Sequence, residues 1–261
     1  MKIQKVTVNN YQVSLSTSGK GLQKVRKTLV LIHGAGCNHA FWEDQLEAWE
    51  GEIDIVAPDL PGHGETDGAA LESMEQYAQW LQTLTATLDL SSFILLGHSM
   101  GGGIVLRAAL DRIPGLEGLV LCSTGARMPV NSWILENAVT HFSETLQLAA
   151  NYCFPKEAPE AWRRRIASHM ATCPPESLYW DFRVCNEWNA RDRVHEISLP
   201  ALILHGDMDM LTPLKFGAFL HENMANSKLV VLDGTGHMPM IERKERFNEE
   251  VLSFVRTISG N

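Results

Sequence analysis

The sequence predicts an α/β protein with a mostly parallel sheet that is flanked by helices. Short apolar runs of strand length alternate along the chain with longer segments of helical periodicity. Continuous apolar runs are typical of strands buried on both faces, which is the usual situation in a parallel sheet. The runs lie at residues 28–32, 53–57, 93–96, 116–122, 199–205 and 228–232.

The composition fits one α/β domain with a sizeable core: 45% of the 261 residues are hydrophobic and 20% are charged. Lysine and arginine total 22 against 31 acidic residues, a net charge of −9. This acidic excess argues against nucleic-acid and anionic-membrane partners and favours a small, uncharged or weakly charged ligand.

The sequence has no apolar leader and no run near the roughly 18 apolar residues of a membrane span, so we expect a cytoplasmic protein. The five cysteines are odd in number and include no C-x-x-C pair. This favours reduced thiols over disulfides or a zinc site.

The first predicted element is a β-hairpin. Alternating apolar residues at 6–8 and 11–15 flank the turn dipeptide Asn9-Asn10. Residues 16–27 are polar and contain glycine, which predicts a loop. The run at 28–32 that follows is expected to be a central buried strand.

The segment 58–64 is dense in turn formers and predicts a rigid loop at a strand end. We interpret Asp59 and His63 within it as residues that brace the turn, rather than as an acid and a base. A helix is expected next, because Ser73 followed by Gln76 forms a capping box ahead of an apolar helical face.

Ser99 lies at a predicted strand-to-helix corner in the spacing G-x-S-x-G. That spacing is typical of a nucleophile elbow, a strained turn that exposes a serine hydroxyl above the sheet. A plain turn needs one glycine, and each glycine in a helix costs roughly 1 kcal/mol relative to alanine. The glycines at 101–103 therefore favour the functional interpretation, with the Met100 N–H as a candidate oxyanion donor.

Residues 126–198 contain no clear buried strand and read as an inserted helical cap on a core domain formed by residues 1–125 and 199–261. This segment is rich in aromatic residues, which predicts an apolar acyl or alcohol group in the substrate. They are Trp133, Phe142, Tyr152, Phe154, Trp162, Tyr179, Trp180, Phe182 and Trp188.

A serine hydroxyl becomes a strong nucleophile only when a histidine removes its proton, and the histidine needs an orienting carboxylate. His237 lies in a glycine-flanked loop after the last strand, whereas His205 still belongs to a strand and is expected to pack. Asp207 and Asp209 both follow the strand at 199–205, and their position alone leaves both open.

From about Thr28 to the closing helix the sequence resembles the α/β-hydrolase superfamily. The resemblance is carried by the ordered motifs HGAG, PDLPGHG, GHSMGG, GDMDMLTP and GTGHMP. It implies an eight-stranded sheet with the cap inserted after strand six. It also implies a Ser99–Asp209–His237 triad, with Asp207 as the fallback, and a second oxyanion donor at Ala35.

A serine at position 99 disfavours the dehalogenases and epoxide hydrolases that resemble this pattern, because they carry aspartate there. With His98 and Met100 on either side of Ser99, the motif looks most like that of carboxylesterases and monoglyceride-lipase-type members. We therefore expect a serine hydrolase that cleaves a small, largely apolar carboxylic ester through an acyl-enzyme, with no cofactor and no metal. The alternatives are a C–C bond hydrolase of ring-cleavage products, an acyl thioesterase, and a ligand receptor with little turnover.

Overall fold

The computed structural model describes residues 2–19, 21–22 and 27–259, and an eight-stranded sheet runs through them. The strand order is β1-β2-β4-β3-β5-β6-β7-β8. The hairpin strands β1 (Lys2–Val8) and β2 (Tyr11–Thr17) are antiparallel, and β2 joins β4 antiparallel. The remaining pairs are parallel, which confirms the predicted fold class. The other strands are β3 (Thr28–Ile32), β4 (Asp54–Pro58), β5 (Phe93–His98), β6 (Leu116–Cys122), β7 (Ala201–Gly206) and β8 (Ser227–Leu232).

The opening hairpin turns where the sequence predicts. Asn9 and Asn10 have φ angles of 49° and 70°, the left-handed backbone that a tight two-residue hairpin needs. Strand β2 continues to Thr17, two residues into the segment predicted as a loop. Residues 20 and 23–26 of that predicted loop lie outside the described residues.

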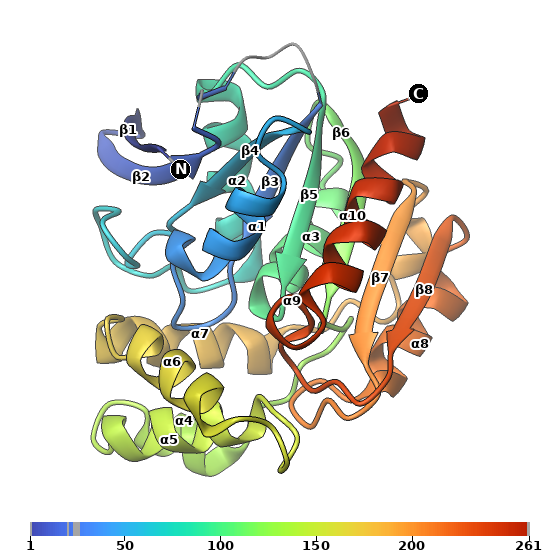
Figure 1. Ribbon diagram of the computed structural model, residues 1–261. Helices are drawn as coiled ribbons and strands as arrows, with labels where there is room; N and C mark the ends of the chain where they lie inside the picture. The colour runs from blue at the N-terminus through green and yellow to red at the C-terminus, as the bar shows by residue number, and fades with distance from the viewer. Residues whose placement is uncertain (1, 20, 23–26, 260–261) are drawn as a thin grey trace.

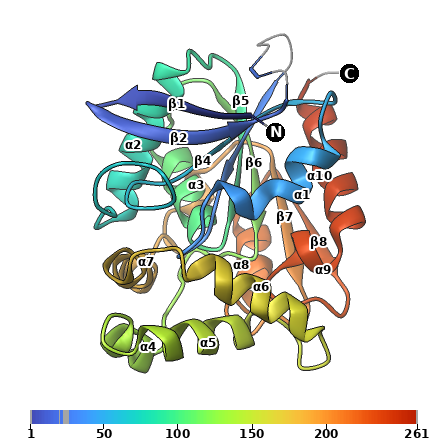
Figure 2. The same cartoon turned by 60° about the vertical axis from the view of Figure 1, so that its left-hand side comes forward.

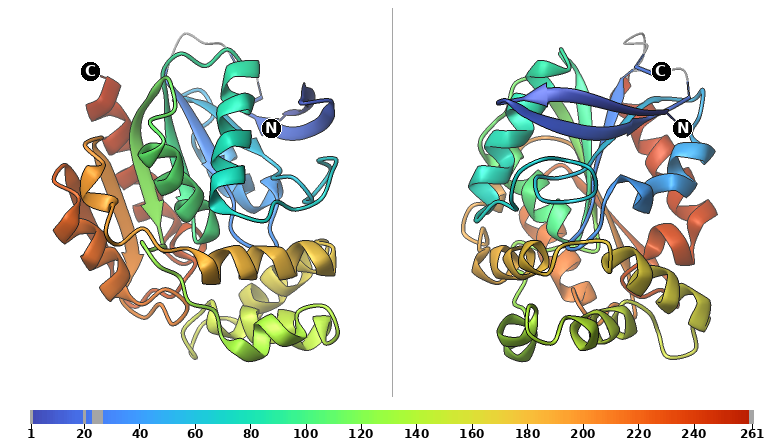
Figure 3. Two further views of the ribbon diagram at one scale, coloured as in Figure 1. Left: turned by 180° about the vertical axis from the view of Figure 1, so that it is seen from behind. Right: turned by 90° about the vertical axis from the view of Figure 1, so that its left-hand side faces the viewer.

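Helices cover both faces of the sheet (Figure 1; Figure 3). One face carries the 3₁₀ turn η1 (His39–Trp42) with α1 (Glu43–Ala48), and α9 (Pro239–Glu242) with α10 (Lys244–Ser259). The other carries α2 (Met74–Thr87), α3 (Met100–Leu110) and α8 (Leu214–Asn223). Successive side chains of a strand point to opposite faces, so β3 sends Leu29 and Leu31 into one core and Val30 and Ile32 into the other.

The capping box at the start of α2 forms as predicted. The Ser73 hydroxyl accepts a hydrogen bond from the Gln76 N–H at 3.2 Å. The Gln76 side chain reaches back to the N–H of Glu72 at 2.8 Å, one residue before the position expected for this motif.

Between β6 and β7 the chain forms α4 (Ser132–Asn137), α5 (Phe142–Tyr152), α6 (Glu160–Met170) and α7 (Pro175–Glu187), then the 3₁₀ turn η2 (Val194–Glu196). Helices α4–α7 form a layer beyond the end of the sheet toward which β5 and β7 point (Figure 1; Figure 2). The two ends of this layer meet. The Ala190 N–H donates to the Ala126 carbonyl at 2.7 Å, and the Trp188 indole N–H donates to the Gly125 carbonyl at 3.0 Å.

Within the described ranges, no helix combines the length and the apolar character that a membrane crossing requires.

Candidate active site

Ser99 lies at the corner between β5 and α3, with a φ of 53° and a ψ of −117°. This conformation is strained for a residue with a side chain, and such strain is concentrated at functional sites. The two flanking glycines are required by close packing. A Cβ on Gly97 would lie 2.3 Å from the Gly101 carbonyl oxygen, and one on Gly101 would lie 2.3 Å from that of Ile32. The corner therefore has the backbone of a nucleophile elbow.

Asp209 and His237 come together at the carboxyl ends of β7 and β8. One carboxylate oxygen of Asp209, Oδ2, lies 2.9 Å from Nδ1 of His237 and accepts a hydrogen bond from the Thr212 hydroxyl at 2.8 Å. The other, Oδ1, accepts the N–H groups of Leu211 and Thr212, each at 2.9 Å. Asp207 is exposed and accepts the Thr235 N–H at 3.2 Å. Of the two candidate carboxylates, Asp209 is the one that contacts His237.

Asp209 carries a negative charge at neutral pH. Burial would raise its pKa, but the attraction of His237 and the hydrogen bonds from His237 and Thr212 outweigh this and lower the pKa to about 2. An ionised carboxylate only accepts hydrogen bonds, so it favours the His237 tautomer with a proton on Nδ1.

The loop that carries His237 is held by two groups that the sequence analysis missed. The ring of His98, the residue before Ser99, donates from Nε2 to the His237 carbonyl oxygen at 2.9 Å, and the two ring centroids are 4.8 Å apart. Burial and repulsion by His237 lower the pKa of His98 to about 3, so this ring is neutral. The His237 N–H donates to the carbonyl of Cys153 at 2.8 Å. Among the described residues, the Ser99 hydroxyl makes no hydrogen bond to His237.

Two backbone N–H groups are available near Ser99. Met100 is the first residue of α3, where an N–H has no acceptor within the helix. The loop 33–36 passes directly over the corner, because a Cβ on Gly34 would lie 3.3 Å from the Cβ of Ser99. Ala35 follows in this loop, and its N–H has no backbone acceptor in the part of the chain that the structure describes.

Ala35 and Ser99 line one cavity of about 350 Å³, most of whose wall is apolar and comes from the helical segment after β6. Of the nine aromatic residues singled out in that segment, Tyr152 and Phe182 are among the lining residues. A cavity of this size is at the small end of ligand sites. Its lining is Ala35, Ser99, Met128, Pro129, Val130, Asn131, Ile134, Ala149, Tyr152, Phe182, Cys185, Met210, Leu211 and Thr212.

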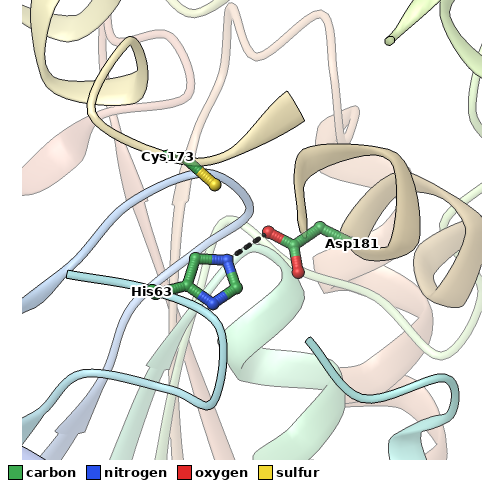
Figure 4. Close-up of side chains that lie close together, drawn as sticks. All are labelled: His63, Cys173 and Asp181. Atoms are coloured by element: carbon green, nitrogen blue, oxygen red, sulfur yellow. Dashed lines mark hydrogen bonds and ion pairs between the residues drawn. The ribbon is translucent and has the colours of Figure 1, made fainter. Parts of the chain in front are cut away.

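Asp59 braces the turn after β4, as predicted. Its Oδ1 accepts the His39 N–H at 2.6 Å and lies 2.8 Å from Nδ1 of the same histidine, and its Oδ2 accepts the Glu65 N–H at 3.0 Å. His63 does more than brace the turn, because its ring also meets Asp181 and Cys173 of the segment after β6 (Figure 4). The potential ligand atoms of these three side chains lie within 4.8 Å of one another, which is within reach of a metal ion.

Comparisons with known proteins agree with this architecture. Residues 29–250 match the sequence model of the Alpha/beta hydrolase family. The pimeloyl-[acyl-carrier protein] methyl ester esterase of Nitrosomonas europaea is 24% identical over 251 residues, which cover 90% of this chain and 96% of that protein. The enzyme of the same name from Neisseria meningitidis serogroup C is 26% identical over 258 residues, with 92% and 97% covered.

Solved structures show the same fold over nearly the whole chain. An esterase from Exiguobacterium antarcticum superposes with a TM-score of 0.88 at 23% identity and covers 97% of this chain and 98% of its own. A thermophilic esterase reaches a TM-score of 0.83 at 29% identity, with 98% of each chain covered. An enol-lactonase from Burkholderia xenovorans reaches 0.88 at 22% identity, with 97% of this chain and 100% of its own covered.

Proposed function

This chain belongs to the α/β-hydrolase family, and from this premise we propose that it is a serine esterase acting on a small, largely apolar carboxylic ester. The hydrolase class follows from the family and from the relatives named as esterases. Two observations support the finer proposal: the 2.9 Å contact of Asp209 with His237, and a half-buried Ser99 that lines an apolar cavity.

In the proposed reaction His237 accepts the Ser99 proton on Nε2 while the hydroxyl oxygen attacks the ester carbonyl. Asp209 holds the proton on Nδ1 and stabilises the positive charge that develops on the ring. The N–H groups of Met100 and Ala35 donate to the oxyanion of the tetrahedral intermediate. The alcohol leaves with the proton from His237, and a water molecule then hydrolyses the acyl-Ser99 ester by the same steps.

The cavity supports a substrate with a small apolar group next to the scissile bond. Its volume of about 350 Å³ is modest, and it holds no charged side chain. Two of its lining residues, Tyr152 and Met210, are also exposed to solvent, at 42% and 51%. A longer group could therefore extend from the cavity into solvent. This favours, as a second candidate, a methyl ester whose acid part is linked to a carrier, the kind of ester named for the relatives above.

The test is steady-state hydrolysis of p-nitrophenyl esters, from acetate to long acyl chains, by the wild type and Ser99→Ala. We expect activity to peak at one chain length and to fall by about 10⁶ in kcat in the variant. Ser132→Ala, a change at an exposed serine outside the cavity lining, serves as the control and should retain wild-type activity.

Equal activity of the wild type and Ser99→Ala on every ester would overturn the proposal. The same proteins would then be assayed on a vinylogous diketone for C–C hydrolysis and on acyl-CoA for thioester hydrolysis. Tight ligand binding without turnover would indicate a receptor.

A further inference from the structure

A buried carboxylate of the helical layer reaches the loop that carries Ala35. Asp181, on α7, has no solvent exposure of its side chain. Its Oδ2 accepts the N–H of Gly36 at 2.7 Å and lies 2.8 Å from Nε2 of His63 (Figure 4). Its Oδ1 accepts a longer hydrogen bond, 3.4 Å, from the hydroxyl of Tyr77. One side chain of α7 thus contacts three residues that lie 104 to 145 positions before it in the sequence.

The hydrogen bonds of His63 indicate that it faces Asp181 as a cation. Its Nδ1 lies 3.0 Å from the Pro61 carbonyl oxygen, which can only accept, so Nδ1 carries a proton. Its Nε2 faces the carboxylate and carries the second proton. Burial opposes this charge, but the attraction and hydrogen bond of Asp181 raise the pKa of His63 well above its usual value. The result is a buried pair in which the carboxylate of Asp181 accepts from the ring of His63.

The hydrogen bond to Gly36 acts on a tight turn. Residues 34–37 form a turn closed by the Cys37 N–H and the Gly34 carbonyl at 3.2 Å, and Gly36 has a φ of 68°. A positive φ at this position is typical of a type II turn. The type I and type II forms differ by a flip of the central peptide, which here joins Ala35 to Gly36. By accepting the Gly36 N–H, Asp181 holds that peptide in one orientation.

The same helix encloses the turn and reaches the substrate cavity. A Cβ on Gly36 would lie 2.8 Å from the Leu178 side chain of α7, so the turn is packed directly against this helix. Phe182, the next residue after Asp181, lines the cavity. A shift of α7 would therefore move a wall of the cavity and the acceptor for Gly36 together.

A metal ion explains the His63–Cys173–Asp181 cluster less well than hydrogen bonding does. A metal on Nε2 of His63 would displace the proton that points at Asp181. A metal on Oδ2 of Asp181 would compete with the N–H of Gly36, a donor at 2.7 Å that has no other acceptor among the described residues. These polar atoms are already satisfied by one another, and the thiol of Cys173 lies beside them.

We propose that Asp181, held by His63, is a positioning residue for the oxyanion hole: by accepting the Gly36 N–H it anchors the turn 34–37, and so holds in place the adjacent Gly34–Ala35 peptide, whose Ala35 N–H donates to the oxyanion. This inference rests on the proposed esterase function and deepens it. It makes α7 part of the machinery for transition-state binding, although Asp181 itself touches no substrate. A positioning role of this kind should affect the transition state more than the bound substrate.

The test compares Asp181→Ala and Asp181→Asn with the wild type on the best p-nitrophenyl ester. Removing one oxyanion donor costs about 10²–10³ in kcat. Because the alanine variant misplaces the Ala35 N–H without deleting it, we expect a fall of about 10- to 100-fold in kcat, with KM within about threefold. Asparagine keeps an oxygen that can accept the Gly36 N–H, so it should restore most of the loss. Glu187→Gln, an exposed change at the end of the same helix, is the matched control.

A second readout separates positioning from a purely structural role. A trifluoromethyl ketone of matched chain length forms a hemiketal on the nucleophile, whose oxyanion needs the same donors. Its affinity should fall in Asp181→Ala by the same factor as kcat/KM, while the variant binds the product acid as the wild type does. Should Asp181→Ala not fold, His63→Gln takes its place, with an expected loss of about 3- to 10-fold in kcat and in inhibitor affinity.

Unchanged inhibitor affinity and unchanged kcat in the folded variants, with Ser99→Ala inactive, would overturn this inference and leave the proposed function intact. A fall in melting temperature with a raised KM and unchanged inhibitor affinity would assign Asp181 to stability alone, which also overturns it. If Ser99→Ala retains wild-type turnover, the proposed function itself fails.

Discussion

Replacing Asp209 with asparagine should reverse the tautomer of His237. An asparagine side chain has one oxygen and one NH₂ group. The N–H groups of Leu211 and Thr212 both point at the Oδ1 position, so the amide oxygen must lie there. The NH₂ group is then left facing Nδ1 of His237, at the 2.9 Å position of the lost carboxylate oxygen. Since NH₂ only donates, Nδ1 must accept, and the ring proton moves to Nε2.

A histidine with its proton on Nε2 cannot accept a proton from Ser99, so kcat should fall by about 10⁴. This corresponds to about 5.5 kcal/mol of transition-state free energy, at about 1.4 kcal/mol for each factor of ten. The shape of the site is preserved, so KM should change by less than about threefold. At neutral pH the wild-type carboxylate is fully ionised, because its pKa is about 2, and the whole loss should be visible there.

Asp207→Asn is the matched control, because Asp207 is the rival carboxylate two residues away, exposed and bonded to the Thr235 N–H instead of to His237. It should keep kcat within about threefold. The assay is kcat and KM on the best p-nitrophenyl ester, with the melting temperature of each variant measured alongside. Loss of activity in Asp207→Asn, or wild-type kcat in Asp209→Asn, would refute the reasoning about the tautomer.

Three further predictions concern the cavity and the pH dependence of stability. Phe182→Ala enlarges the cavity and should shift the preferred acyl chain in the ester series to a longer one. Trp133→Ala, at an exposed residue outside the lining, should leave the preferred chain unchanged. If Phe182→Ala had the same chain-length profile as the wild type, this would argue against the cavity as the acyl site. Burial raises the pKa of Asp59, but hydrogen bonds from His39 and Glu65 lower this pKa overall. The carboxylate therefore contributes stability above its usual pKa of 3.8, and this contribution is lost as the pH falls below 3.8. Asp59→Asn should flatten the dependence of the unfolding free energy on pH between about 5 and 3, measured by urea titration. The pKa of His63 is raised, so the stability from its pairing with Asp181 is fully present below the usual histidine pKa of 6.5 and is lost as the pH rises toward the raised pKa. Above about pH 7 the melting temperature of His63→Gln should therefore fall less with pH than that of the wild type. Parallel curves for the two proteins would contradict this.

The candidate nucleophile, acid and base could be predicted from sequence because each lies in a local motif after a buried strand. Parallel strands bring their carboxyl ends to one edge of the sheet, so the candidates Ser99, Asp209 and His237 all follow strands that end at that edge, although they are far apart in the chain. The choice of Asp209 over Asp207 came from the resemblance. A local signal was also available, since the Asp209 side chain accepts N–H groups two and three residues ahead, as aspartate does in turns.

The supporting contacts could not be predicted, because they have no local pattern. Asp181 and Gly36 are 145 residues apart, and His98 and His237 are 139 apart. A single aspartate in a mixed polar and apolar helix looks like a solvent-facing residue, and the prolines around α6 and α7 obscure the helical periodicity. The aromatic residues of the segment after β6 are a poor guide to the cavity, because their number does not say which of them face inward.

The meeting of the two ends of the helical layer, at residues 125–126 and 188–190, has a consequence for how such proteins diversify. A segment whose two ends lie together at the sheet can be replaced by another of different length without a change in the strand order. The entropic cost of closing the segment grows only slowly with its length. A transplanted segment, however, would arrive without Asp181. If Asp181 has the positioning role proposed above, chimeras made at this junction would keep Ser99, Asp209 and His237 and gain a different cavity wall, yet would turn over slowly until a second acceptor for the Gly36 N–H evolves.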